Sequence, residues 1–252
     1  QLEGELIYKT YAYISNTIHL IDSDWRLLIT GSNRYGKLGL GLTTEGSLSV
    51  FGRTNEMYSI KKIVNTYSQS FILTNNGDLL IAGNNTNNIF LNENITKLSV
   101  FYHLMSNIKD VAGTAYGSDC SVAVIKTDGT LWVNGGNSKG QLGTGDQVAV
   151  VGWQQIGTDM DWDKVFMGYN STFIIKSDGT LWRSGYNHYG TLGSGNAVDI
   201  TTFTKLNNDT DWIKVASYLN TLILKSNGDV YGCGYNNNGE LGLTHAMQVN
   251  NA

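Results

Sequence analysis

Gly135-Gly-Asn-Ser-Lys-Gly-Gln-Leu-Gly143 is one of five related segments, and this repetition decides the fold. The other copies are Gly31-Ser-Asn-Arg-Tyr-Gly-Lys-Leu-Gly39, Gly83-Asn-Asn-Thr-Asn-Asn-Ile-Phe-Leu91, Gly185-Tyr-Asn-His-Tyr-Gly-Thr-Leu-Gly193 and Gly234-Tyr-Asn-Asn-Asn-Gly-Glu-Leu-Gly242. The leading glycines lie about 50 residues apart, which is typical of a repeat architecture. Letters shared by the copies are therefore predicted to be structural, and letters that vary are candidates for function.

Each repeat has room for three or four short strands. In the fourth repeat, Trp162–Phe166, Thr172–Ser177 and Thr180–Ser184 are rich in β-branched and aromatic residues. Asp178-Gly179 separates the last two runs and predicts a hairpin with a type I′ turn. The same place is held by Asn76-Gly77, Asp128-Gly129 and Asn227-Gly228, whereas Asp24 replaces the glycine in the first repeat. A looser fourth strand is expected at Gly152–Ile156 and Thr202–Leu206.

The second strands, such as Phe71–Leu73, are apolar on both faces, as in sheets that are covered on both sides. These features predict an all-β fold, a β-propeller of about five blades with repeats of about 50 residues. Residues 1–252 are expected to form a single propeller domain, with repeats centred on Gly31, Gly83, Gly135, Gly185 and Gly234. In the shared loop, the asparagine is expected to hydrogen-bond its own backbone and the leucine to fill the core.

Asp128 to Gly145, and Asp178 to Gly195 almost as well, carry the pattern Asp-Gly-Thr-Leu-Trp, four residues, Asn-x-x-Gly-x-Leu-Gly-x-Gly. This pattern resembles the regulator of chromosome condensation repeat family, across all five repeats and strongly in three. The lead-in at Thr158–Val165, echoed at Asp209–Val215, is similar to that of bacterial and bacteriophage members. The resemblance implies a β-propeller, commonly of seven blades.

The chain holds five repeats rather than seven, which leaves two interpretations. Met247–Asn250 would complete the blade that Glu5–Tyr8 begins and so close a ring of five. Alternatively, the chain is part of a seven-bladed or composite propeller.

Composition limits the class of ligand. Charged residues make up 15% of the chain, against a usual share of about 25%, and the net charge is −4. No cluster of Lys and Arg provides the basic footprint that nucleic-acid binding needs, so no nucleic acid is expected. No apolar stretch has the length of a membrane span.

Several motifs have a structural interpretation that we prefer. Gly31–Leu38 imitates a phosphate-binding loop but lacks its Ser or Thr and its helix. The four histidines are scattered, so no enzyme, metal or cofactor is predicted. The acidic pairs Asp22/Asp24, Asp159/Asp161 and Asp209/Asp211 are interpreted as solvated turns rather than calcium ligands, Cys120 and Cys233 as buried thiols, and Trp132 and Trp182 as packing residues.

The variable letters of the loops are the candidate binding site, because Tyr with Asn and Ser is typical of recognition surfaces. The candidates are Arg34, Tyr35, Lys139, Tyr186, His188, Tyr189, Tyr235 and Asn237.

Three functions remain open. The first is a non-enzymatic binding propeller on an exterior surface, a phage attachment or decoration protein or a bacterial surface protein, with a cell-surface glycan or a protein as partner. The second, implied by the family resemblance, is guanine-nucleotide exchange on a small GTPase or docking to chromatin, and the acidic net charge weighs against the chromatin role. Its location would be cytoplasmic, and Thr43–Tyr58 and Asn84–Ser106 are its candidate insertions. The third is a purely structural part of a larger assembly.

Overall fold

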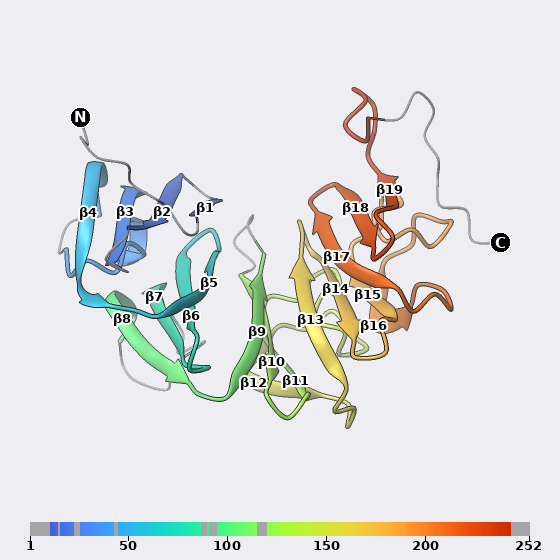
Figure 1. Cartoon of the computed structure of the whole chain (residues 1–252), viewed down its shortest axis with the longest axis horizontal. Helices are drawn as coiled ribbons and strands as arrows, with labels where there is room; N and C mark the ends of the chain where they lie inside the picture. Colours follow the sequence, from blue (N-terminus) through green and yellow to red (C-terminus); the bar gives the residue numbers. More distant parts are fainter. Residues whose placement is uncertain are drawn as a thin grey trace. The chain divides into compact units, whose positions relative to one another are not determined.

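The computed structural model describes residues 11–14, 16–22, 26–42, 45–86, 90, 95–114 and 120–242. In these ranges it is all β, apart from short 3₁₀ turns such as Arg34–Gly36 (Figure 1). The chain divides into two compact units, Gln1–Ile108 and Lys109–Ala252, and each is described by itself. The expected all-β fold is confirmed.

The first unit contains two four-stranded antiparallel sheets, in which the strands follow chain order. The first sheet is made of β1 (Tyr11–Ile14), β2 (Thr17–Ile21), β3 (Arg26–Ser32) and β4 (Ser47–Met57). The second sheet is made of β5 (Ile60–Asn65), β6 (Gln69–Thr74), β7 (Leu79–Asn84) and β8 (Lys97–Met105). The interpretation of Thr43–Tyr58 and Asn84–Ser106 as insertions is therefore wrong, because these stretches contain the ordinary fourth strands β4 and β8.

The second unit contains three antiparallel sheets. The four-stranded sheets are β9 (Ile108–Gly113), β10 (Ser121–Lys126), β11 (Leu131–Gly135) and β12 (Val150–Ile156), then β13 (Trp162–Met167), β14 (Ser171–Lys176), β15 (Leu181–Gly185) and β16 (Ile200–Lys205). The last sheet has β17 (Trp212–Ser217), β18 (Asn220–Lys225) and β19 (Val230–Gly234). The proposed closing segments Glu5–Tyr8 and Met247–Asn250, and the turn at Asp24, lie outside the described residues.

The Asp-Gly hairpins form, but their turn type differs from the prediction. Gly179 has φ +80° and donates its N–H to the carbonyl oxygen of Lys176, while Lys176 N–H donates to Thr180 O. Asp178 is not among the residues with positive φ, and a type I′ turn needs two such residues. The hairpin is therefore a three-residue loop, a type I turn followed by a glycine bulge.

The repeated letters of Asp-Gly-Thr-Leu-Trp stabilise this turn. Asp178 Oδ1 accepts hydrogen bonds from the N–H (2.9 Å) and the hydroxyl (2.7 Å) of Thr180. The indole N–H of Trp182 donates to the same hydroxyl oxygen at 3.1 Å. Asp128, Thr130 and Trp132 repeat the arrangement one blade earlier.

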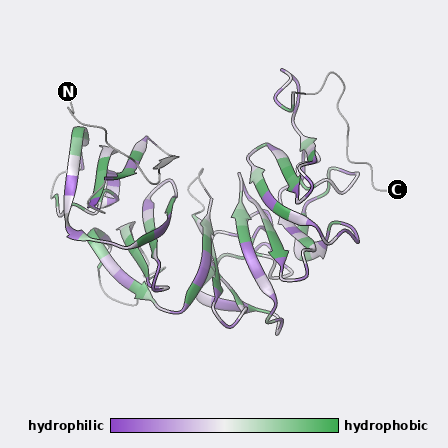
Figure 2. Cartoon of the chain, viewed as in Figure 1, coloured by the Kyte–Doolittle hydropathy of each residue, from purple (hydrophilic) through white to green (hydrophobic). Residues whose placement is uncertain are grey.

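The second strands lie in the middle of the core, as their apolar faces predicted. Every residue of β6 and of β14 is buried, and the strand interiors are correspondingly hydrophobic (Figure 2). β18 is less buried, and its Leu222 is 40% exposed.

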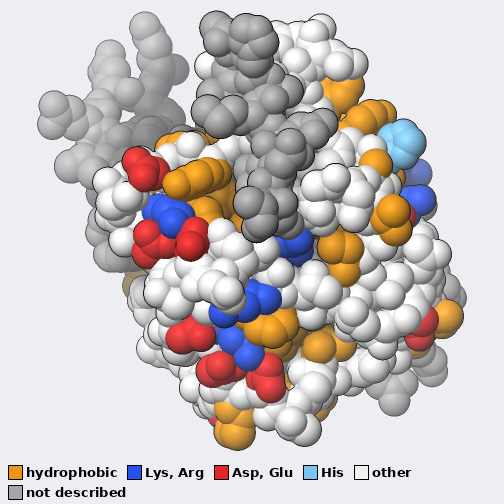
Figure 3. All heavy atoms as spheres, turned by 90° about the vertical axis from the view of Figure 1, so that its right-hand side faces the viewer, with side chains coloured by type: hydrophobic (Ala, Val, Ile, Leu, Met, Phe, Trp, Pro, Cys, Tyr) orange, Lys and Arg blue, Asp and Glu red, His pale blue; other side chains and the backbone are white. Residues whose placement is uncertain are grey.

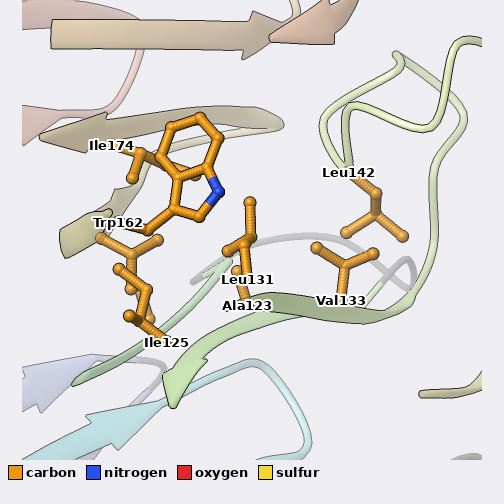
Figure 4. Packing of buried hydrophobic residues seen from close by; sticks show 9 residues of the cluster. Ala123, Ile125, Leu131, Val133, Leu142, Trp162 and Ile174 are labelled. Carbon is orange, nitrogen blue, oxygen red and sulfur yellow. The ribbon is translucent and has the colours of Figure 1, made fainter. Parts of the chain in front are cut away.

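The recurring leucine joins neighbouring sheets. Leu142 descends from the loop after β11 toward Val133, and Trp162 and Ile174 of the next sheet face the same cluster (Figure 4). Leu38 and Leu192 occupy the same kind of position in their own clusters, and all three side chains are 0% exposed. The leucine and Trp182, which packs against the first of these clusters, are confirmed as packing residues.

The recurring asparagine braces the loop, although not as the expected local turn. Asn187 Oδ1 accepts the N–H of Leu192, five residues later, at 2.8 Å. Its amide group donates to Ser194 Oγ, Asn196 O and Val198 O. In the degenerate second repeat Asn85 keeps this role toward Phe90, which takes the place of the leucine and lies edge-on against Phe71.

Candidate functional site: a tyrosine surface

The shape of a repeat brings two loops to one end of each sheet. In a four-stranded antiparallel sheet, the turn between strands one and two and the loop between strands three and four lie at the same end. The first glycine of each repeat makes this packing close. Gly185 has φ +111°, and a Cβ there would overlap the carbonyl oxygen of Asn170 in the facing turn.

Six aromatic side chains among the described residues meet at this end of the second unit, and we name them the tyrosine surface. They are Tyr169, Tyr186, His188, Tyr189, Tyr218 and Tyr235. Tyr169 and Tyr218 belong to the turns before β14 and β18, and the others belong to the loops after β15 and β19. Residues from two consecutive repeats therefore share one surface.

The rings form a continuous series with mostly edge-to-face contacts. The ring of Tyr169 lies 5.7 Å from that of Tyr218 and 5.9 Å from that of Tyr186. His188 lies 5.0 Å from Tyr189, whose ring is 5.2 Å from Tyr235. Edge-to-face pairs hold one another at defined angles, so the rings are arranged before any ligand arrives.

The surface combines apolar faces with available polar groups. Tyr189 and Tyr218 are 42% and 45% exposed. No hydrogen bond within the described residues occupies the hydroxyls of Tyr186, Tyr189 or Tyr235. Partial burial, and then the neighbouring Tyr189 and Asp199, raise the pKa of Tyr186, so its hydroxyl stays protonated at neutral pH.

The charges beside the surface are balanced. Lys139 Nζ lies 5.5 Å from the ring centre of Tyr186 and 3.9 Å from Asp199 Oδ2. Asp199 also accepts the backbone N–H of Asn187 at 2.8 Å, which fixes the base of the loop. Figure 3, in which tyrosine has the colour of the hydrophobic side chains, shows a histidine beside hydrophobic and basic side chains on one face of the molecule.

The predicted site residues thus fall into three groups. Lys139, Tyr186, His188, Tyr189 and Tyr235 come together. Asn237 is exposed in the loop after β19, two residues beyond Tyr235, and makes none of these ring contacts.

The third group is in the first unit. Arg34 Nη1 donates to the hydroxyl of Tyr67 at 2.9 Å, and its guanidinium lies 5.0 Å from the ring centre of Tyr35. Tyr35 has φ +63° and is partly buried. As in the tyrosine surface, a loop side chain contacts a tyrosine of the following repeat. Arg34, Tyr35 and Tyr67 nevertheless form a separate and smaller cluster.

Sequence reasoning missed Tyr67, Tyr169 and Tyr218. A usable signal existed, since each of them stands two residues before a second strand, at Gln69, Ser171 and Asn220. The tyrosines lie in short turns outside the Gly-x-Asn-x-x-Gly segment that defined the repeat. A search for variable positions within that segment therefore did not include them.

The acidic pairs hold a cation of the chain itself. Lys176 Nζ lies 2.6 Å from Asp159 and 2.9 Å from Asp161, and above the rings of Trp162 and Trp182. Burial lowers the pKa of Lys176, but hydrogen bonds to Asp159 and Asp161 outweigh it and the net shift is upward. Lys225 bridges Asp209 and Asp211 in the same way. The carboxylates of these two pairs stay 38–51% exposed, as the prediction of solvated turns requires, but each pair also binds a lysine that the prediction did not include.

The first acidic pair differs, because Asp22 pairs with Arg53 Nη2 at 2.7 Å and Asp24 lies outside the described residues. The described residues contain no group of three His, Cys, Asp or Glu side chains placed to hold a metal ion.

One serine, histidine and aspartate do meet, on the second sheet of the first unit. Ser106 Oγ donates to Asp78 Oδ1 at 2.6 Å, and both contact the same imidazole nitrogen, Nε2 of His103. A catalytic triad needs the carboxylate on the opposite ring nitrogen, where it orients the base. This exposed cluster therefore lacks triad geometry, and its hydrogen bonds, led by that of Ser106, lower the pKa of Asp78.

Other predicted structural residues are placed as expected. Lys37, in the segment that imitates a phosphate-binding loop, is 2% exposed and donates to Tyr67 O at 3.3 Å. Cys120 and Cys233 are buried thiols that form no disulfide with each other. Within the described ranges, no helix combines the length and apolar character that crossing a bilayer requires.

Comparison with known proteins agrees with this architecture. The sequence profile of the regulator of chromosome condensation (RCC1) repeat matches residues 215–240. A search of curated protein sequences finds no match.

Solved structures share the fold over most of the chain. Human WBSCR16 matches 90% of it with a TM-score of 0.73 at 16% identity, and Prp20p of Saccharomyces cerevisiae matches 90% with 0.73 at 18%. Yeast RCC1 (Prp20) in complex with Kap60 matches 90% with 0.74 at 19%. The chain spans only 60%, 57% and 56% of the lengths of these three structures. Together, the repeat match and these likenesses support a β-propeller of the RCC1 type.

Proposed function

We propose that this chain is a non-enzymatic binding propeller that recognises a surface glycan, and that the tyrosine surface makes the contact. The observation that carries the proposal is the continuous series of six aromatic rings from two consecutive repeats. Rigid aromatic rings provide contact area at a low entropy cost, which suits a recognition surface.

A sugar ring fits the chemistry of this surface. Its C–H faces pack on aromatic faces, and its hydroxyls pair with the available groups of Tyr186, Tyr189 and Tyr235. The balanced charges of Lys139 and Asp199 favour a neutral ligand over a strongly charged one. A location on a virion or a bacterial surface, consistent with the phage-like spelling of the repeats, would give the surface access to such a ligand.

The test is a glycan array followed by titration of the best ligand. Tyr189→Ala and Tyr235→Ala are expected to weaken binding at least about tenfold, as removal of a central aromatic contact does. The control is Tyr102→Ala on β8, which lies outside both clusters and should bind normally. A blank array at high protein concentration, or equal binding by all variants, would contradict the proposal.

A second candidate rests on the structural likeness. Prp20p of Saccharomyces cerevisiae binds Gsp1p and histones. A related role here would be guanine-nucleotide exchange on a small GTPase, although fold alone does not confer it. A nucleotide-release assay over a panel of small GTPases tests this candidate, and no acceleration would rule it out for that panel.

A further inference from the structure

The described four-stranded sheets carry an aromatic side chain at the same place in the fourth strand. These residues are Phe51 of β4, Phe101 of β8, Trp153 of β12 and Phe203 of β16. Each directly precedes the residue at which pairing with the third strand resumes after a bulge. A bulge bends its strand and re-aims a side chain. The fourth strand therefore has one specific aromatic position.

Two of these rings pack on a glycine of the preceding sheet. A Cβ at Gly143, in the loop after β11, would overlap the ring of Phe203, and a Cβ at Gly39 would overlap the ring of Phe101. The ring of Phe203 also lies 5.9 Å from that of Trp162. The last glycine of the repeated loop thus makes room for an aromatic side chain of the next fourth strand.

The last sheet has this glycine but no aromatic side chain against it. Gly193 corresponds to Gly143, and the atoms nearest to a Cβ built there are Cys233 Sγ at 3.4 Å and a methyl carbon of Leu206 at 3.7 Å. Among the described residues, β19 pairs with β18 and with no fourth strand.

A cavity of about 50 Å³ lies beside this glycine, and we name it the socket. Its walls include Gly193, Leu206, Trp212, Ile223, Tyr231 and Cys233. Trp212 and Ile223 correspond to Trp162 and Ile174, which belong to the cluster that Phe203 packs against. The socket therefore lies where the ring of a fourth strand packs in the preceding sheet.

The backbone beside the socket also lacks its usual partner. Gly41 N–H donates to Ser99 O at 2.7 Å, and Gly145 N–H donates to Thr201 O at 2.9 Å, so each loop binds the fourth strand of the next sheet. Gly195 is the equivalent residue, and its N–H makes no backbone hydrogen bond to a described residue. A backbone donor and an apolar cavity thus fit the same missing strand.

The end of the fifth repeat offers no aromatic side chain for this place. In the three preceding repeats the aromatic residue stands 18 residues after the first glycine, as Phe203 follows Gly185. The residue at that distance from Gly234 is Ala252, and residues 239–252 contain no Phe, Tyr or Trp. The pattern therefore favours an aromatic residue from another chain.

We propose that the socket receives a Phe or Trp side chain of an extended strand that a partner protein donates. The strand pairs with β19, completes the last sheet and accepts the N–H of Gly195. Such strand addition derives affinity from backbone hydrogen bonds and specificity from a side-chain pocket. The partner strand resembles β16, in which Phe203 stands between threonines, because β16 fills the equivalent place one sheet earlier.

A labelled peptide with the sequence Asp199–Leu206, which contains β16, tests this assignment. Fluorescence anisotropy follows its binding to the full chain up to about 0.5 mM protein, the range for a single short strand. Saturable binding is expected. Phe203→Ala in the peptide should weaken it at least about tenfold, as loss of an anchoring aromatic side chain does. Phe203→Trp in the peptide should still bind, because Trp153 holds this position in β12.

A substitution in the protein then tests the location. Cys233→Leu adds bulk to the wall of the socket and should weaken peptide binding at least about tenfold. The matched control is Cys120→Leu, at the other buried cysteine, which does not line the socket and should bind normally. Circular dichroism and the melting temperature confirm that both variants are folded, and the peptide series tests the socket even where one is not.

No binding up to 0.5 mM, or equal binding of the Phe and Ala peptides, would overturn the proposal. Binding that appears only in the variant Met247→Asp, Val249→Asp would also overturn it, because residues of this chain would then compete for the socket. Self-association of the wild type that Cys233→Leu abolishes would identify a second copy, rather than a different protein, as the occupant and would equally contradict it.

Discussion

A single side chain, His19, gives the first repeat a property that the equivalent positions of other repeats lack. His19 occupies the position on β2 that Phe71 holds on β6 and Phe173 on β14. It is 0% exposed, and its Nδ1 lies 3.0 Å from Asn65 Nδ2. The first repeat therefore places a titratable side chain where the second and fourth repeats place a phenyl ring.

His19 should make folding sensitive to mild acid. Burial, and then the charge of Lys37, lower its pKa from 6.5 to about 3. The unfolded chain therefore binds a proton that the folded chain does not between pH 6.5 and 3. Stability is expected to fall with decreasing pH in that window, by up to about 1.4 kcal/mol per pH unit.

Urea unfolding at several pH values between 4 and 7 measures this slope. His19→Phe should reduce this slope between pH 5 and 6.5, above the range in which the carboxylates contribute most, whereas His188→Gln, at an exposed histidine, should leave it unchanged. A slope in that range that is the same in His19→Phe and in the wild type would assign the acid sensitivity to another group.

The first glycine of each repeat is required by a close approach as well as by its conformation. Gly135 has φ +103°, and a Cβ there would overlap the carbonyl oxygen of Cys120. Gly152 has a similar φ of +81° with no atom near its Cβ position. We expect Gly135→Ala to lower the free energy of unfolding by about 3 kcal/mol or more, and Gly152→Ala by about 1 kcal/mol, as measured in urea. Equal losses would mean that φ alone explains the glycine.

At the scale of the element, the loop after the third strand is held from inside by its asparagine. Asn187 is 0% exposed and connects the start of the loop to Leu192 and to Val198. The loop can therefore present variable aromatic side chains without losing its shape. The residues that hold the loop are thus different from those that it exposes. The exposed side chains can therefore differ from repeat to repeat while the fold stays the same.

Removing this brace should destabilise the loop strongly. Asn187→Ala leaves several buried backbone groups without partners and is expected to lower the free energy of unfolding by about 2 to 4 kcal/mol. Asn237→Ala, at an exposed position of the equivalent loop, should change it by less than about 0.5 kcal/mol. Thermal and urea unfolding compare the two, and a small effect of Asn187→Ala would show that the loop is held elsewhere.

At the scale of the whole molecule, stability comes from sheet-to-sheet contacts within each unit. Leu142 and Leu192 lie between consecutive sheets, whereas Leu241 lies on the last sheet, next to the half-exposed Leu222. The recurring leucine therefore has different surroundings in different repeats.

This difference predicts unequal effects of one substitution. Leu142→Ala should lower the free energy of unfolding of the second unit by about 2 to 5 kcal/mol, because it leaves a cavity between two sheets. Leu241→Ala should cost at least about 1 kcal/mol less, since Leu241 is 8% exposed and the partly exposed side chains near it let the site relax. Calorimetry tests the order, and an equal loss would show that the last leucine is enclosed as fully as the others.

The repeat itself determined the strands, the hairpins and the sheet-joining leucines, because these depend on local patterns that recur every 50 residues or so. It also separated Tyr186, His188 and Tyr189 from the structural letters around them. Only the tertiary structure decided that Asp159 and Asp161 bind Lys176, and that Tyr169 and Tyr218 complete the tyrosine surface. Those contacts join residues from different strands, turns or repeats, so their distances follow from how the sheets twist and stack, which no single repeat encodes.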